Sequence, residues 1–171
     1  MQRNNLSILG LDHAGKTVIR NYLTSGNISP DVHPTLAVDI SKYADENLFF
    51  MIVDFPGQPK LRTLWPAQFA YTKIILFVID VSAPDRFEAA EKELLNLLDN
   101  DLLDKIPIIF LFHKMDKPEA IANLAKAKEY FDIGSITGRN VFYFETSIKN
   151  PKSLENVKNM LIIMMQSLVM K

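Results

Sequence analysis

The most constraining feature of this 171-residue chain is a glycine-rich segment near its amino terminus. Residues 10–17 have the sequence GLDHAGKT, a G-x-x-x-x-G-K-T pattern, and they follow the apolar run LSIL at residues 6–9. A loop of this kind between a strand and a helix points backbone N–H groups at a phosphate, and the helix dipole assists them. The lysine adds a mobile cation and the threonine hydroxyl a Mg²⁺ ligand. The segment predicts a nucleoside triphosphate site contacted by Asp12, His13, Ala14, Gly15, Lys16, Thr17 and Val18.

Apolar runs alternate with amphipathic segments along the chain, which predicts an α/β fold with helices on both faces of a sheet. We expect strands at residues 6–9, 38–43, 48–54, 74–80, 107–113 and 141–145. Helices are expected at residues 16–24, 85–99, 118–131 and 154–170, with Asp85 and Glu88 as a capping pair for the second. The polar turn at 45–47 predicts an antiparallel hairpin, and the runs at 74–80 and 107–113 are typical of central parallel strands. The prediction is therefore a single domain, residues 1–171, with a six-stranded, mostly parallel sheet.

A second motif, D-x-x-G-Q at residues 54–58, follows the third expected strand. The carboxylate of Asp54 could hold Mg²⁺ opposite Thr17, and the backbone N–H of Gly57 could reach a γ-phosphate because no side chain blocks the approach. Gln58 is then placed to orient an attacking water, so Gln58 and Lys16 are the expected catalytic residues. A chance turn is the alternative for either motif alone, but their pairing argues against it.

Base recognition is predicted at K-x-D, residues 114–116, which closes the fifth strand after His113. The Asp116 carboxylate could accept hydrogen bonds from N1–H and N2–H₂ of guanine, which adenine lacks. The aliphatic stem of Lys114 could lie along the base. After the sixth strand, the loop of Ser147 and Ile148 could present a backbone N–H to guanine O6 and pack Ile148 against the base.

The loop at residues 29–35, SPDVHPT, ends in a hydroxyl between the first helix and the second strand. Thr35 could complete the Mg²⁺ shell when a γ-phosphate draws the loop inward, which is order–disorder switching. A rigid connector is the alternative. The metal ligands expected from the sequence are therefore Thr17, Thr35 and Asp54.

Together, the phosphate loop, Thr35, D-x-x-G-Q, K-x-D and the T-S pair at residues 146–147 resemble the small GTPases across nearly the whole chain. Within them the chain is most similar to the Arf branch and its relatives, the Sar-type proteins and the signal-recognition-particle receptor β-subunit. The residues that carry this resemblance are GLD at 10–12, AGKT at 14–17, Pro34-Thr35, LR at 61–62, LW at 64–65, Asp80 and Asp85-Arg86. The resemblance implies the small G domain of P-loop NTPases, GTP or GDP with Mg²⁺ as ligands, and an exchange factor, an activating protein and an effector as partners.

Several residues depart from the family pattern. His113 replaces the usual asparagine of N-K-x-D, although an imidazole of suitable tautomer could still donate to guanine N7. The sequence H-K-M-D also occurs in Rag-type GTPases, so a Rag-like relationship stays open. Pro56 and Pro59 bracket Gln58, and Pro59 biases Gln58 away from helical geometry. We hypothesise that the second switch begins more rigidly here. The family's interswitch aromatic triad, a partner-binding surface, maps onto Val38, Val53 and Gln68, none of which is aromatic. The partners typical of Arf proteins are therefore not assumed for this chain.

The composition bears on two classes of partner, nucleic acids and membranes. The chain has 19 basic and 20 acidic residues without basic clusters, which gives no sign of nucleic acid binding. It has no cysteine for prenylation or palmitoylation, and Gln2 occupies the position where myristoylation needs glycine. The lipid-modified helix of Arf proteins is absent from the sequence as given, by nature or by truncation. We expect a cytoplasmic protein that reaches membranes only through partners.

The last expected helix carries more apolar residues than one core-facing stripe needs, because Ile162, Ile163, Met165 and Val169 extend it. The alternatives are a partner or dimer surface and a deeply packed terminal helix.

For the chain as a whole we predict a GTP/GDP switch with slow hydrolysis. No arginine occurs between residues 21 and 61, so the first switch contains no residue that could act as an arginine finger. A non-cycling, GTP-bound docking subunit is the alternative, and a nucleoside-phosphate kinase, which leaves D-x-x-G-Q unexplained, ranks last.

Overall fold

The computed structural model describes residues 4–29 and 33–169, without the side chains of residues 64 and 169. Residues 30–32 of the first expected switch and residue 170 of the last expected helix lie outside this part. The strands are β1 (Asn5–Gly10), β2 (Asp39–Ala44), β3 (Phe49–Asp54), β4 (Thr72–Asp80), β5 (Ile108–His113) and β6 (Val141–Glu145). The α-helices are α1 (Lys16–Ser25), α2 (Phe87–Leu98), α3 (Pro118–Phe131) and α4 (Pro151–Val169). All six expected strands and all four expected helices are present, with ends that differ by at most three residues from the predicted ones.

The strands form one sheet in the order β2-β3-β1-β4-β5-β6. Among the strands of the described part, β2 and β3 are the antiparallel pair, joined by the turn at residues 45–47, where the Asp45 carboxylate accepts from the amides of Asn47 and Leu48. The central strands β4 and β5 are buried along almost their whole length. The predicted hairpin and the predicted buried parallel strands are both confirmed.

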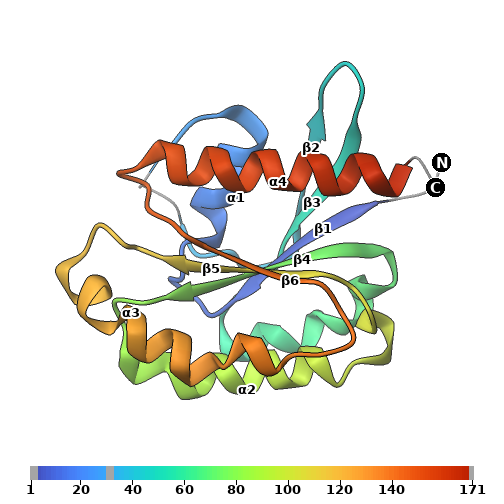
Figure 1. Cartoon of the computed structure of the whole chain (residues 1–171). Helices are drawn as coiled ribbons and strands as arrows, with labels where there is room; N and C mark the ends of the chain where they lie inside the picture. Colours follow the sequence, from blue (N-terminus) through green and yellow to red (C-terminus); the bar gives the residue numbers. More distant parts are fainter. Residues whose placement is uncertain (1–3, 30–32, 170–171) are drawn as a thin grey trace.

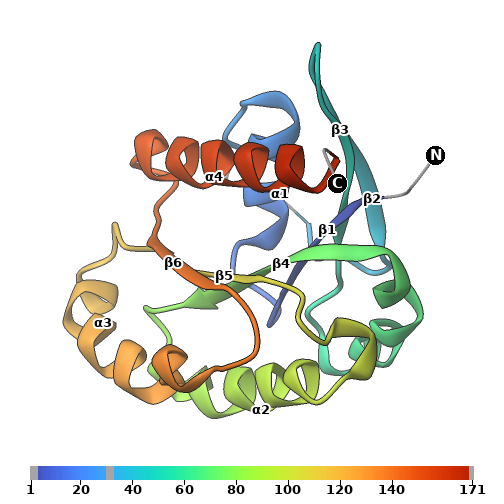
Figure 2. The same ribbon diagram turned by 45° about the vertical axis from the view of Figure 1, so that its right-hand side comes forward.

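Helices cover both faces of the sheet, α1 and α4 on one side and α2 and α3 on the other (Figures 1 and 2). Alternate residues of β4 face opposite sides of the sheet. Leu76 and Val78 pack in the core with α1 and α4, whereas Phe77 and Ile79 pack in the core with α2 and α3. Such an open sheet binds ligands beyond the carboxyl ends of its strands, where the loops converge.

The entry to α2 differs from the prediction. Pro84 begins the 3₁₀ turn η3 (Pro84–Arg86), so the α-helix begins only at Phe87, and its N-terminal cap position is Arg86 without a side-chain hydrogen bond. The expected capping pair of Asp85 and Glu88 is therefore wrong, because the proline-initiated turn takes Asp85 out of the α-helical register.

Further short 3₁₀ segments were not expected from the sequence. Two of them, η1 (Pro59–Leu64) and η2 (Pro66–Tyr71), connect β3 to β4, and each begins at a proline. The other two are η4 (Asp101–Leu103) before β5 and η5 (Ile133–Ser135) before β6.

The residues predicted to extend the apolar stripe of α4 differ in burial. Met165 is fully buried and Ile162 is half-buried in the layer that contains α1, whereas Ile163 is 63% exposed and the side chain of Val169 lies outside the described part. The described side chains therefore favour the deeply packed terminal helix over a broad apolar partner surface. In the described part of the chain, no helix combines the length and apolar character needed to cross a membrane.

Candidate functional site

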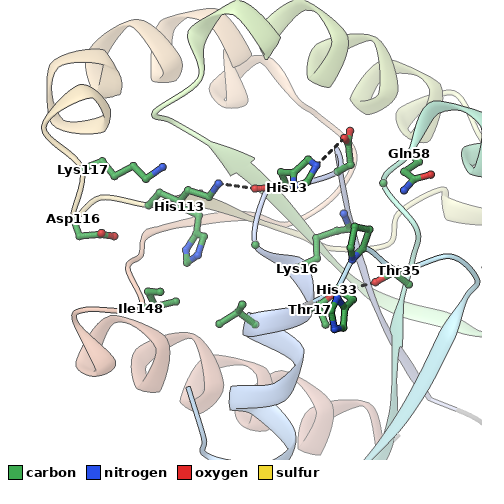
Figure 3. A pocket seen from close by; sticks show the side chains of 16 residues that line it. His13, Lys16, Thr17, His33, Thr35, Gln58, His113, Asp116, Lys117 and Ile148 are labelled. Carbon is green, nitrogen blue, oxygen red and sulfur yellow. Dashed lines mark hydrogen bonds and ion pairs between the residues drawn. The ribbon is translucent and has the colours of Figure 1, made fainter. Parts of the chain in front are cut away.

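A cavity of about 340 Å³ opens where the loops after β1, β3, β5 and β6 converge (Figure 3). Small-molecule and cofactor sites have volumes of this order. Among the residues expected from the sequence, those that line it are Asp12, His13, Gly15, Lys16, Thr17, Val18, Thr35, Gly57, Gln58, His113, Lys114, Asp116 and Ile148. Ala14, Asp54 and Ser147 lie behind this lining, in the buried part of the protein.

The phosphate loop holds a buried cation. Lys16, at the start of α1, is 5% exposed, and its Nζ donates to the carbonyl of Leu11 at 2.7 Å. Burial lowers its pKa to about 8, although nearby Asp54 and Asp12 oppose that shift. A Cβ on Gly57 would lie 2.5 Å from this Nζ and collide with the backbone of Leu11 and Asp12. Only glycine allows the loop after β3 to approach the phosphate loop so closely.

Three oxygen-bearing side chains from different elements meet beside Lys16. The Thr17 hydroxyl donates to Asp54 Oδ2 at 2.7 Å and lies 3.0 Å from the Thr35 hydroxyl, which is itself 3.5 Å from Asp54 Oδ2. Asp54 is completely buried, and its other oxygen, Oδ1, has no hydrogen-bond partner in the described part of the chain. Burial raises the pKa of this carboxyl.

This donor set fits Mg²⁺. A hard cation prefers carboxylate and hydroxyl oxygens, and it would compensate the buried charge of Asp54. The two threonine hydroxyls would complete the protein's part of the shell. Among the described residues, no cluster of three or more His, Cys, Asp or Glu side chains suited to a metal occurs.

At the opposite end of the cavity, Asp116 is held in place by its neighbours. Ser147 Oγ donates to Asp116 Oδ1 at 2.6 Å, and this hydrogen bond lowers the pKa of the carboxyl. Lys114 Nζ donates to Asp80 Oδ2 and to the His13 carbonyl, both at 2.6 Å. Lys114 therefore ties the loop after β5 to the phosphate loop, and Asp116 remains an ionised acceptor at the edge of the cavity.

His113 connects three parts of the site. It is 2% exposed, its Nδ1 lies 2.8 Å from the Thr146 hydroxyl, and a Cβ on Gly15 would come within 2.8 Å of its Nε2. Burial lowers the pKa of the imidazole to about 4, so the ring is neutral at physiological pH. Gly15, at a φ of +103°, admits the ring because it has no side chain.

The loop after β6 uses most of its own amides. The N–H of Ser147 donates to Ser153 Oγ, that of Lys149 to Ser147 Oγ, and that of Asn150 to the Ser147 carbonyl. The Ile148 amide has no acceptor among the described residues, so it is the group of this loop left to meet a base oxygen. Ser147 itself supports Asp116 and does not line the cavity.

Side chains fasten the segment that carries Gln58. Gln58 has extended backbone angles, φ −66° and ψ 137°, which confirms the expected effect of the following proline. Arg62 Nε donates to the Gly57 carbonyl at 2.9 Å and its NH1 to Glu93, while Trp65 Nε1 donates to the Pro56 carbonyl at 3.0 Å.

Sequence reasoning missed several residues of the site. His33, Pro34 and Lys117 line the cavity although they were not expected there. Lys117 directly follows the K-x-D motif, which is a signal that could have found it. Arg86 donates to the Asp12 carbonyl at 2.7 Å and to its carboxylate, and it lowers the pKa of that carboxyl against the opposing effect of burial.

Comparison with known proteins places this site in a family. The model of the ADP-ribosylation factor family matches residues 1–165. The chain belongs to the ADP-ribosylation factor family. It is therefore a small GTPase that binds GTP and GDP with Mg²⁺ and hydrolyses GTP, as the resemblance implied.

The relatives of this Arf-family chain agree with the assignment. ADP-ribosylation factor-like protein 8b of Arabidopsis thaliana is 32% identical over 161 residues, which cover 94% of this chain and 87% of the relative. Protein 8d of the same plant is 31% identical over 157 residues, 92% of this chain and 89% of the relative. The structure of the Arl6 BBS3 small GTPase from Trypanosoma brucei, with the bound nucleotide analogue GppNp, is similar in fold, with a TM-score of 0.76 at 20% identity over 92% of this chain and 98% of that one.

Proposed function

We propose that this GTPase is a molecular switch that cycles between GTP and GDP, with slow Mg²⁺-dependent hydrolysis, in the regulation of membrane traffic or signalling. The observation that carries the proposal is the meeting of Thr35 with Thr17 and Asp54. Thr35 belongs to the loop before β2, whereas the other two residues are anchored at the ends of α1 and β3. A ligand set shared between a loop and fixed elements lets the nucleotide state control that loop.

Slow hydrolysis follows from the residues around Gln58. Gln58 lines the cavity and could orient water, and Lys16 could stabilise charge on the phosphates. No arginine is among the cavity-lining residues in the described part of the chain, and Arg62 and Arg86 are engaged with Glu93 and Asp12. An activating protein would therefore have to supply the arginine, which makes activator, exchange factor and effector the proposed partners and any membrane contact indirect.

A single-turnover assay on purified protein loaded with GTP and Mg²⁺ tests this proposal. The expected intrinsic rate is on the order of 10⁻⁴ s⁻¹, typical of small GTPases without a finger. Gln58→Leu should lower the intrinsic hydrolysis rate by at least ~10-fold, because leucine cannot hydrogen-bond and orient the attacking water. Gln68→Leu, in η2 and outside the cavity lining, is the matched control and should leave the rate unchanged. Fast hydrolysis by the protein alone would contradict the proposal.

A second candidate function is a docking subunit that holds GTP without cycling. The hydrogen bonds from Trp65 to Pro56 and from Arg62 to Gly57 favour it, because they restrain the segment that a switch must move. The nucleotide retained after a long purification separates the two functions. GDP supports the cycling enzyme, whereas intact GTP supports the docking subunit.

A further inference from the structure

The hydrogen bond between His113 and Thr146 decides where the imidazole carries its proton. Neutral histidine has one ring nitrogen that donates and one that accepts, and the partner of one nitrogen fixes the role of the other. Here Nδ1 is 2.8 Å from the Thr146 hydroxyl, while the ring lines the cavity and rests against Gly15. In Figure 3 the His113 ring points into the space between β5 and α1.

The surroundings of Thr146 settle which group donates. Thr146 is completely buried, and within the described residues its hydroxyl has His113 Nδ1 as its hydrogen-bond partner. If Nδ1–H donated to the hydroxyl, the hydroxyl proton would be buried without an acceptor. That arrangement would be disfavoured by roughly 5- to 150-fold, the equivalent of one unsatisfied buried polar group.

We propose that Thr146 donates to Nδ1 of His113 and so fixes the tautomer with the proton on Nε2, and that this Nε2–H is the group that recognises N7 of guanine. The inference rests on the proposed binding of a guanine nucleotide in this cavity. Thr146 is a positioning residue, since it acts through His113 and does not itself line the cavity.

The position of His113 in the site supports this assignment. Its neighbour along the loop, Asp116, is the acceptor for the opposite edge of the base, and an N–H donor at His113 is complementary to the acceptor N7. The charged groups that act on His113 are Lys114, Asp80 and Asp116; burial, together with Lys114, outweighs the two carboxylates and lowers the pKa of the imidazole to about 4. A neutral ring keeps the same donor across the physiological pH range.

Two measurements on the full chain test the inference. The first is the long-range ¹H–¹⁵N NMR spectrum of the imidazoles, with His113→Asn used to assign the His113 signals among the three histidines. We expect an unprotonated Nδ1 and a protonated Nε2 in the wild type and in Thr146→Ser. Thr146→Val, of similar shape but without a hydroxyl, should show a mixture of both tautomers.

The second measurement compares the affinities for GDP and 7-deaza-GDP, which differ at the N7 acceptor. The wild type should prefer GDP by about 10-fold, the effect of one hydrogen bond. His113→Asn keeps a donor and should retain the preference, whereas His113→Leu should bind the two nucleotides equally. In Thr146→Val the preference for GDP over 7-deaza-GDP should fall a few-fold, because part of the population must change tautomer on binding.

A proton on Nδ1 in the wild type, or equal binding of the two nucleotides by the wild type, would overturn the inference while leaving the proposed function intact. Absence of binding to either nucleotide would overturn the proposed function instead. The wild-type spectrum and the wild-type affinities decide the matter even if a variant fails to fold.

Discussion

The two ends of the cavity are prepared for the nucleotide in different ways. At the phosphate end, Lys16 and Asp54 are buried charges whose pKa values are displaced toward neutrality, and Asp54 Oδ1 has no partner within the described residues. At the base end, Asp116 has a lowered pKa because Ser147 donates to it, and His113 is a neutral ring hydrogen-bonded to Thr146. Electrostatic strain at one end thus contrasts with preorganised hydrogen bonds at the other.

This difference indicates where the binding free energy and the selectivity arise. Phosphates and Mg²⁺ would relieve the buried charges, so the phosphate end should supply most of the affinity and couple binding to stability. The base end gains less energy from binding, but it rejects the wrong base because its groups would be left unpaired. Substitutions at the two ends should accordingly change different quantities.

The largest expected effect is at the base end. Replacing Asp116 by Asn exchanges one of the two carboxylate acceptors for N1–H and N2–H₂ of guanine for an NH₂ donor, which suits the C2 carbonyl of xanthine. The preference between GTP and XTP should reverse, with a change in selectivity of about 10⁴-fold, measured by competitive binding. Ser147→Ala removes the hydrogen bond to Asp116 and the acceptor of the Lys149 amide but leaves the Asp116 carboxylate in place; it is the control and should keep the preference for guanine. Unchanged selectivity in Asp116→Asn would remove Asp116 from the base site.

At the phosphate end, the expected effect appears in stability. The pKa of Lys16 is about 8 in the folded protein against 10.5 ordinarily. Between these values the unfolded chain binds more protons, so the stability of the nucleotide-free protein should rise with pH, by at most about 3 kcal/mol. Denaturant unfolding of the nucleotide-free protein from pH 7.5 to 10.5 measures the rise, and Lys16→Met should flatten it. An equal slope in the variant would contradict the assignment to Lys16.

The smallest expected effect concerns the segment between the ends. Pro56→Gly should increase the freedom of the second switch, whose carbonyls at Pro56 and Gly57 are held by Trp65 and Arg62. We expect a changed difference in hydrogen exchange between the GDP and GTP states within residues 55–65. Exchange profiles identical to the wild type would refute the idea that Pro56 stiffens this switch.

Sequence patterns predicted those parts of the molecule in which the signal is local. The buried runs of β4 and β5 and the loop from Gly10 to Thr17 carry their structure in consecutive residues, so their positions were evident. The 3₁₀ segments at residues 59–71 have no helical or strand period, and side chains such as Arg62 and Trp65 hold them through distant contacts.

The supporting residues of the base end were hidden for a similar reason. Thr146 and Ser147 occupy a short polar turn, which is ordinary in sequence, and their partners His113 and Asp116 are 33 and 31 residues away along the chain. The capping prediction for α2 was wrong because a local pattern at Asp85 and Glu88 competed with the turn begun by Pro84. The sequence predicted the residues that line the cavity better than the residues that hold them in place.

The most direct test of the central claim is calorimetry of the purified, nucleotide-free protein with GDP and with GTP, in Mg²⁺ and in EDTA. If one guanine nucleotide joins the two ends of the cavity, each nucleotide should bind with a dissociation constant below micromolar in Mg²⁺. Removing the cation should weaken binding by at least ~10-fold, since Asp54 and the two threonines lose the ion that joins them to the phosphates. An absence of association at micromolar concentrations, or an affinity indifferent to Mg²⁺, would contradict the account.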